Sequence, residues 1–228
     1  MPDTGRRVVF EGAVNFRDLG GLRAAGGAVV RRHRLFRSDS LHGLTSGDLT
    51  RLHDELGVRT VLDLRMDSEV DEHGPPLGHF RDHVRWLRLP LFTSFRPEWA
   101  EPSAWATESL RAQRYLEFIE SGSAQLARLV IELSQPEGTP AVVHCQVGRD
   151  RTGVAVALVL ELLGVERGLI GEDYAVSARY ITEFPLSADR MTALLGLIDS
   201  TYGSTASLLR EHGVQDSHVA ALRAALLV

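Results

Sequence analysis

The chain contains a single cysteine, Cys145, and no lysine, so all 25 of its basic residues are arginine. One cysteine cannot form an internal disulfide, which is compatible with a reducing compartment. A GC-rich coding bias explains the missing lysines. An arginine at a position where lysine would also serve therefore says little by itself about function.

Long apolar runs are missing as well. The longest, from Val154 to Leu160, is far short of the roughly 20 apolar residues that a membrane-spanning helix needs. The first ten residues lack the apolar core of a signal peptide, and no basic run indicates nucleic-acid binding at a net charge of −5. We expect a cytoplasmic protein with no membrane span and no nucleic-acid partner; export without a signal peptide stays open.

The hydrophobic pattern alternates between strand and helix along the 228 residues, a length that suits a single domain, 1–228. Strands are predicted at 29–30, 35–36, 58–64, 84–89 and 141–144. Helices are predicted at 45–55, 105–120, 123–134, 150–163, 166–178, 187–199, 204–212 and 216–227. This order predicts an α/β fold with a central, mostly parallel sheet flanked by helices. The stretch 179–200 is a candidate helical lid, and plain packing is an equally good interpretation.

The most informative stretch surrounds the cysteine. The apolar strand 141–144 leads into Cys145, five residues separate it from Arg151, and Thr152-Gly153 follow at the start of an apolar helix. Such a strand–loop–helix turn gathers backbone N–H groups and the positive end of a helix dipole around one point. A cysteine held there beside a guanidinium is expected to be a thiolate, and the same point suits a phosphate dianion. The pattern predicts cysteine-dependent hydrolysis of phosphate esters.

Each residue of this loop has an expected role. Cys145 is the candidate nucleophile that forms a phosphocysteine, and Arg151 is the cation that binds two phosphate oxygens. Gly148 lets the loop turn, His144 orients it by hydrogen bonds, and the Thr152 hydroxyl is expected to donate to the sulfur. The candidate phosphate-binding residues are Gln146, Val147, Gly148, Arg149, Thr152 and Gly153.

The stretch His144-Cys145-x5-Arg151-Thr152-Gly153 resembles the signature loop of the protein tyrosine phosphatase superfamily. Segments 15–21 (Asn-Phe-Arg-Asp-Leu-Gly-Gly), 36–38 (Phe-Arg-Ser) and 63–65 (Asp-Leu-Arg) resemble an atypical bacterial branch of it. That branch has Gly-Lys-Asp-Arg in the loop, where this chain has Gly-Arg-Asp-Arg. The resemblance implies a cysteine-phosphatase fold acting on phosphorylated proteins, above all on phosphotyrosine, with phosphoserine, phosphothreonine and phosphoinositides as further substrate classes.

The proton donor to the leaving group is left open between two carboxyl groups. The resemblance favours Asp150, inside the loop, and Asp63, at the end of a strand, is the alternative. The resemblance also implies that Asn15, Arg17 and Asp18 border the site, although a purely structural turn is nearly as good an interpretation.

Two other arginines have expected partners. Arg65 is expected to pair with Glu69 or Asp67. Arg149 is expected to face the mouth of the pocket, where it would bind a second phosphate of an inositol headgroup.

Two other classes of function compete with the phosphatase. One is a binding module that holds phosphorylated ligands without turnover; the intact Cys145 and Arg151 argue against it. The other is a rhodanese-type sulfur transferase, against which Thr152-Gly153 and the spacing of the loop argue. The histidines at 53, 73, 79 and 83 lack metal-ligand spacing, so no metal and no cofactor is expected.

Overall fold

The computed structural model describes residues 5–76, 84–94, 97, 101–181 and 186–228. Its centre is a five-stranded sheet with the order β1-β2-β5-β3-β4. The strands are β1 (Arg17–Asp18), β2 (Leu35–Ser38), β3 (Thr60–Asp63), β4 (Arg85–Arg88) and β5 (Ala141–His144). Neighbouring strands are parallel except β1 and β2, which are antiparallel.

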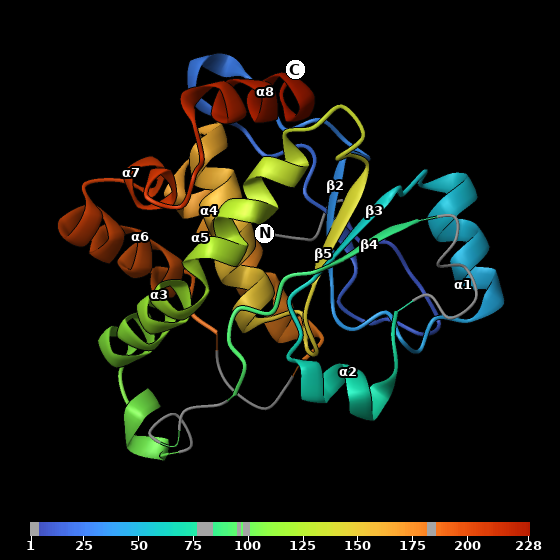
Figure 1. The fold of residues 1–228 in the computed structure, drawn as a ribbon, viewed down its shortest axis with the longest axis horizontal. Helices are drawn as coiled ribbons and strands as arrows, with labels where there is room; N and C mark the ends of the chain where they lie inside the picture. Colours follow the sequence, from blue (N-terminus) through green and yellow to red (C-terminus); the bar gives the residue numbers. More distant parts are fainter. Residues whose placement is uncertain (1–4, 77–83, 95–96, 98–100, 182–185) are drawn as a thin grey trace.

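Most of the helices follow the sequence pattern, but the one at 67–73 was not predicted. They are α1 (Ser46–Thr50), α2 (Asp67–His73), α3 (Glu108–Leu133), α4 (Asp150–Leu163), α5 (Arg167–Val176), α6 (Asp189–Tyr202), α7 (Thr205–Arg210) and α8 (Asp216–Leu226). In Figure 1, α3 to α8 gather on one side of the sheet and α1 lies on the other. The predicted α/β class, with a mostly parallel central sheet flanked by helices, is confirmed.

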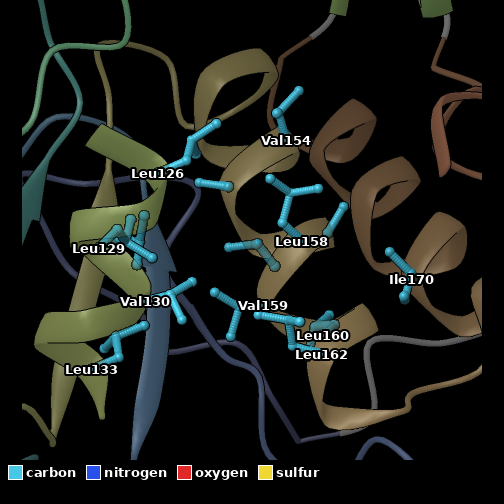
Figure 2. Packing of buried hydrophobic residues seen from close by; sticks show 14 of the residues in the cluster. Leu126, Leu129, Val130, Leu133, Val154, Leu158, Val159, Leu160, Leu162 and Ile170 are labelled. Atoms are coloured by element: carbon cyan, nitrogen blue, oxygen red, sulfur yellow. The ribbon is translucent and has the colours of Figure 1, made fainter. Parts of the chain in front are cut away.

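Alternate residues of the central strands belong to two separate cores. Leu62 and Val143 lie in the larger core with α3 and α4, whereas Val61 and Val142 lie in a smaller core that includes Leu49 of α1. This is the period-two pattern of strands that are covered on both faces. Figure 2 shows the larger core, where side chains of α3 such as Leu129 and Val130 face those of α4 such as Val159.

The predicted helices 105–120 and 123–134 form one helix, α3, which continues through Gly122. That residue has non-helical φ and ψ of −119° and 17°. A Cβ on it would lie 2.6 Å from the carbonyl oxygen of Leu91, so only glycine lets the two backbones pass this closely. The separation predicted from the sequence is therefore wrong, because the break is a kink within a continuous helix.

Helix α4 is enclosed by protein, and its residues from Arg151 to Leu160 are all buried. It begins where three strands end side by side, because Ser38 of β2 and Asp63 of β3 both pair in register with His144 of β5. Open α/β sheets bind ligands at this carboxyl edge. Within the described ranges, neither α4 nor any other helix is long and apolar enough to cross a membrane.

Most of the candidate lid segment 179–200 is helix α6, while residues 182–185 lie outside the described part of the chain. Met191, Leu194 and Ile198 of α6 are fully buried in the larger core. In this structure α6 is therefore part of the packed body of the domain, which supports the packing interpretation for this part of the segment.

Candidate active site

The residues from Cys145 to Arg149 form a tight loop between β5 and α4. Gly148 has a φ of 71°, a left-handed conformation that glycine adopts without strain. A Cβ on Gly148 would lie 2.4 Å from the carbonyl oxygen of Ser38, so the position also lacks room for a side chain. The Gly148 N–H points back into the loop and donates to Cys145 Sγ at 3.3 Å. The loop thus curls around a buried thiol.

Groups outside the loop hold its carbonyl oxygens outward. The Ser40 N–H donates to the Gln146 carbonyl at 3.1 Å. Asn15 Nδ2 and Arg37 Nη2 both donate to the Gly148 carbonyl, at 3.1 and 2.8 Å. In a trans peptide unit the N–H points opposite to the carbonyl, so the N–H groups that follow these carbonyls turn inward. A ring of inward N–H groups at a helix N-terminus is an anion-binding arrangement.

The Arg151 guanidinium lies in the first turn of α4 and contacts Glu69 of α2. Its Nη1 and Nη2 donate to the two carboxylate oxygens at 2.5 and 2.7 Å, and Nη1 also donates to the Leu64 carbonyl at 3.4 Å. These contacts use three of the five guanidinium N–H groups. The remaining two, on Nε and Nη2, share one edge, and such an edge matches two oxygens of a phosphate.

Both members of this pair are charged at neutral pH. Burial alone would lower the pKa of Arg151, but the hydrogen bonds to Glu69 and the negative charge of Cys145 raise it. Burial alone would raise the pKa of Glu69, but the hydrogen bonds and charge of Arg151 lower it. Arg151 is therefore a permanent cation beside the loop, and the charge of Glu69 balances it.

Asp150, the first residue of α4, is held by two donors. Arg149 Nε donates to both of its carboxylate oxygens at 3.1 and 3.0 Å, and the Tyr115 hydroxyl donates to Oδ1. Burial would lower the pKa of Arg149, but the charge of Asp150 raises it. Arg149 thus lies against Asp150, whereas the sequence led us to expect that it faces the mouth of the pocket.

A chain of buried donors leads to Asp150 from three helices. Arg190 Nη1 donates to the Tyr174 hydroxyl oxygen at 2.7 Å, and this oxygen lies 2.8 Å from that of Tyr115. Because the proton of Tyr115 goes to Asp150, Tyr174 donates to Tyr115. Burial raises the pKa of Tyr115 well above its usual value and that of Tyr174 to about 12, so both phenols stay neutral donors. At its far end, Arg190 pairs with Glu108 at 2.9 and 3.1 Å.

Asp63 is enclosed by donors. Its carboxylate accepts from the backbone N–H, Nε and Nη2 of Arg65 at 2.8–3.1 Å, and from Trp86 Nε1 at 3.3 Å. His144 Nε2 lies 3.7 Å from Oδ1, and its Nδ1 lies 3.2 Å from the Cys145 carbonyl oxygen. Burial would raise the pKa of Asp63, but the hydrogen bonds and the charge of Arg65 lower it. Asp63 therefore braces the end of β3 as a buried anion.

Taken together, these contacts describe a loop that curls around a buried thiol and leads directly into the first turn of α4, which carries Asp150 and Arg151. Among the residues described here, no cluster of His, Cys, Asp and Glu side chains has the arrangement to hold a metal ion. The model of the tyrosine phosphatase family matches residues 8–228. The chain belongs to this family.

Two relatives found by sequence agree with this assignment. The phosphatase is 29% identical to the triple specificity protein phosphatase PtpB of Mycobacterium tuberculosis, over 95% of this chain and 97% of PtpB. It is 24% identical to a tyrosine-protein phosphatase of Nostoc commune, over 83% of this chain and 73% of that protein. Among solved structures, the core catalytic domain of the phosphatase SIW14 from S. cerevisiae has a TM-score of 0.45 at 15% identity, covering 69% of this chain and 78% of that chain. The expected superfamily is confirmed, and the protein is a cysteine-based protein tyrosine phosphatase.

The N-terminal motif of the phosphatase divides into two parts. Asn15 and Arg17 lie behind the loop, where the Asn15 side chain accepts from Arg17 Nη1 at 2.5 Å and donates to the loop carbonyl groups. Asp18 turns away from the site, and its carboxylate accepts from the N–H groups of Gly20 at 2.8 Å and His33 at 3.0 Å. The structure therefore does not bring Asp18 to the site, because its carboxylate fixes a turn.

The start of α4 also departs from expectation at two residues. Thr152 Oγ1 is buried and has no hydrogen-bond partner among the described residues, so the expected bond to the sulfur is not formed. The Gly153 N–H donates to the Arg149 carbonyl within the helix at 2.8 Å and is not available to an anion. A Cβ on Gly153 would lie 2.8 Å from the Tyr174 ring, so this glycine makes room for the donor chain. Val147 is 40% exposed at the outer face of the loop.

Several site residues were not predicted from the sequence. The expected pairing of Arg65 with Glu69 or Asp67 is wrong, because Arg65 pairs with Asp63 and Glu69 pairs with Arg151. In the sequence, Arg37 stands out only as part of the Phe-Arg-Ser motif, which does not indicate its partners. The remaining ones, Tyr115, Tyr174 and Arg190, come from helices whose patterns indicate packing and carry no local signal of a polar role.

Proposed function

We propose that the phosphatase removes phosphate from tyrosine side chains of proteins through a phosphocysteine intermediate. The main support is the loop itself, which curls around the one thiol of the chain and is followed, in the first turn of α4, by the charged Arg151 with an open two-donor edge. Phosphoserine, phosphothreonine and phosphoinositides are proposed as further substrates. The name of PtpB, a triple specificity phosphatase, supports this breadth.

The proposed reaction has two steps. The Cys145 thiolate attacks phosphorus, the bond from phosphorus to the leaving oxygen breaks, and Asp150 gives that oxygen a proton. Water then attacks phosphorus, Asp150 takes a proton from it, and the phosphorus–sulfur bond breaks to release inorganic phosphate and the thiolate. Throughout, Arg151 and the loop N–H groups bind the nonbridging oxygens, on which charge develops.

Asp150 is the better candidate for the proton donor because of access. Its side chain is 26% exposed, whereas that of Asp63 is 1% exposed and surrounded by Arg65. The donors Tyr115 and Arg149 hold the Asp150 carboxyl group in place beside the loop. Asp63 then has a supporting role at the base of the site.

The proposal for phosphoinositides involves Arg149. Its side chain is 17% exposed and pairs with Asp150, so a second phosphate would have to join this ion pair. Arg149→Ala is therefore expected to slow both phosphotyrosine and phosphoinositide hydrolysis, and the lipid to a greater degree. Rates of the variant on a phosphotyrosine peptide and on a multiply phosphorylated phosphoinositide test this. Equal losses would assign Arg149 to Asp150 alone.

The decisive experiment is turnover of a generic aryl phosphate by wild type and by Cys145→Ser. We expect hydrolysis by wild type only, with a phosphorylated protein species trapped by acid quenching and seen by intact mass. The Ser variant should still bind vanadate. Activity in the Ser variant would reject the covalent mechanism. Absence of turnover by wild type, with phosphate bound, would favour a binding module, and turnover of thiosulfate would favour sulfur transfer.

A further inference from the structure

Among the residues that the structure describes, a buried cluster of charges behind the loop contains more cations than anions. The carboxylate of Asp173, on α5, accepts hydrogen bonds from Arg6 at 2.8 Å, Arg17 at 3.2 Å and Arg37 at 2.8 Å. Arg17, Arg37 and Asp173 are at most 1% exposed, and Arg6 is 14% exposed. Three guanidinium groups thus share one carboxylate in a region with little water.

Other buried arginines near the site have one carboxylate each. Arg65 pairs with Asp63, and Arg151 pairs with Glu69. A one-to-one pairing is what the cost of burying charge favours, because an uncompensated buried charge is strongly destabilising. The excess positive charge around Asp173 therefore calls for a negative charge that is present when the protein works.

The excess charge is directed at the phosphatase loop. Arg37 Nη2 donates to the Gly148 carbonyl at 2.8 Å, whereas its Nη1 donates to Asp173. Burial and the neighbouring charge of Arg17 lower the pKa of Arg37 to about 10, while the negative charges of Asp173 and Cys145 oppose this. On its loop side, Arg37 holds the Gly148 peptide, whose N–H donates to Cys145 Sγ at 3.3 Å, so a negative charge on the sulfur or on a bound phosphate would lie near this cation.

We propose that Arg37, with the cluster around Asp173, is a positioning residue that stabilises the negative charge held in the phosphatase loop. It fixes the Gly148 carbonyl outward and so the following N–H inward, and its uncompensated charge raises the positive potential at Cys145. The effect adds to those of the α4 dipole and Arg151, which act on the loop from other directions. The proposal rests on Cys145 being the nucleophile, but its test needs no turnover.

The test is the rate of alkylation of Cys145 by iodoacetamide as a function of pH, since this is the only thiol and only its thiolate reacts. Arg37→Gln keeps an amide donor for the Gly148 carbonyl and removes the charge. Arg37→Lys keeps the charge and loses the guanidinium fork. Arg167→Gln, on the same helix as Asp173 but paired with Glu161 at the surface, is the matched control.

At the pH where the wild-type rate is half maximal, Arg37→Gln should react roughly tenfold more slowly, and at alkaline pH all variants should react alike. Arg37→Lys and Arg167→Gln should stay within about threefold of wild type. Protection by inorganic phosphate should weaken in the Gln variant only. The proposal would be overturned if Cys145 in Arg37→Gln were alkylated at the wild-type rate. It would also be overturned if Arg37→Gln and Arg37→Lys slowed the alkylation equally. If Arg37→Gln does not fold, the test is made on Arg37→Lys alone. Alkylation of Arg37→Lys as slow as that of a free thiol would then overturn the proposal.

Discussion

Glu69 holds the outer edge of Arg151, so its substitution tests whether that contact positions the guanidinium for phosphate. The two oxygens of Glu69 accept from Arg151 at 2.5 and 2.7 Å, and one of them also accepts from the Met66 N–H at 2.7 Å. Glu69→Gln keeps the shape of the side chain and one acceptor. The second acceptor becomes an amide NH₂ that faces an N–H of Arg151. One charge-assisted hydrogen bond, worth about 1.5–3 kcal/mol, is lost.

The loss is expected in kcat. Without its second anchor, Arg151 can turn its open edge away from the loop, and transition-state binding falls by up to the energy of the lost bond. That energy corresponds to a reduction of roughly 10- to 200-fold. A second effect has the opposite sign, because the negative charge of Glu69 repels a phosphate dianion and the variant removes it. We therefore expect KM and the inhibition constant of phosphate to stay constant or to decrease.

Steady-state kinetics on an aryl phosphate measure both effects, and phosphate inhibition measures the second separately. Glu72→Gln is the matched control, because Glu72 lies on the same helix, α2, with a side chain that is 73% exposed and 3.8 Å from His73. The control should match wild type. An unchanged kcat for Glu69→Gln, or an equal decrease in both variants, would show that Arg151 does not depend on this contact.

Three further predictions concern other groups of the site. Asp150→Asn should lower turnover by about 10²–10⁴-fold, and less for substrates with acidic leaving groups. Asp63→Asn should mainly lower the free energy of unfolding, by about 3–5 kcal/mol. A larger loss of turnover in Asp63→Asn than in Asp150→Asn would move the proton donor to Asp63. Tyr115→Phe leaves a buried hydroxyl without its acceptor and should cost about 1–3 kcal/mol in urea unfolding, and an unchanged midpoint would contradict the donor chain. The three arginines hold the pKa of Asp173 well below its usual value although burial opposes this, so its contribution to stability is complete above about pH 4 and declines as the pH falls. The stability difference between wild type and Asp173→Asn, followed by denaturation against pH, should shrink on acidification, and a constant difference would contradict this.

The sequence was sufficient for the loop and for most of the helices because both depend on local patterns, whereas the short helix α2 was missed. The helix predicted from residue 45 does begin there, with a capping box of Thr45 and Asp48 at the start of α1. Gly148 was read as a turning point, and it has a φ of 71°. Gly122 shows where local patterns mislead. In the sequence this glycine indicates a break between two helices, but in the structure it lies inside one helix and leaves room for a neighbouring backbone.

The partners of the charged residues could not be read from the sequence. Glu69 and Arg151 are 82 residues apart, and Arg37 and Asp173 are 136 apart. Their proximity follows from the parallel register of the sheet and from the way α2 and α5 pack beside it. In the sequence, Glu69 had a closer candidate in Arg65, but Asp63 occupies that arginine from two residues away. Local charge spacing therefore named the wrong pair.

The chemistry of the site depends on arginine in a way that lysine could not reproduce. Arg151 donates to Glu69 with one edge and keeps another edge open, and Arg37 reaches Asp173 and the Gly148 carbonyl with different nitrogens. Each does so because a planar guanidinium places five donors in fixed directions, whereas an ammonium group is a single point of charge. A bias toward arginine explains its frequency along the chain, but at these two positions the structure uses its geometry. The two arginines differ in how their charges are balanced. Arg151 has one carboxylate to itself, so that pair has no net charge. Arg37 shares one carboxylate with two other cations, and it therefore contributes net positive charge to the loop.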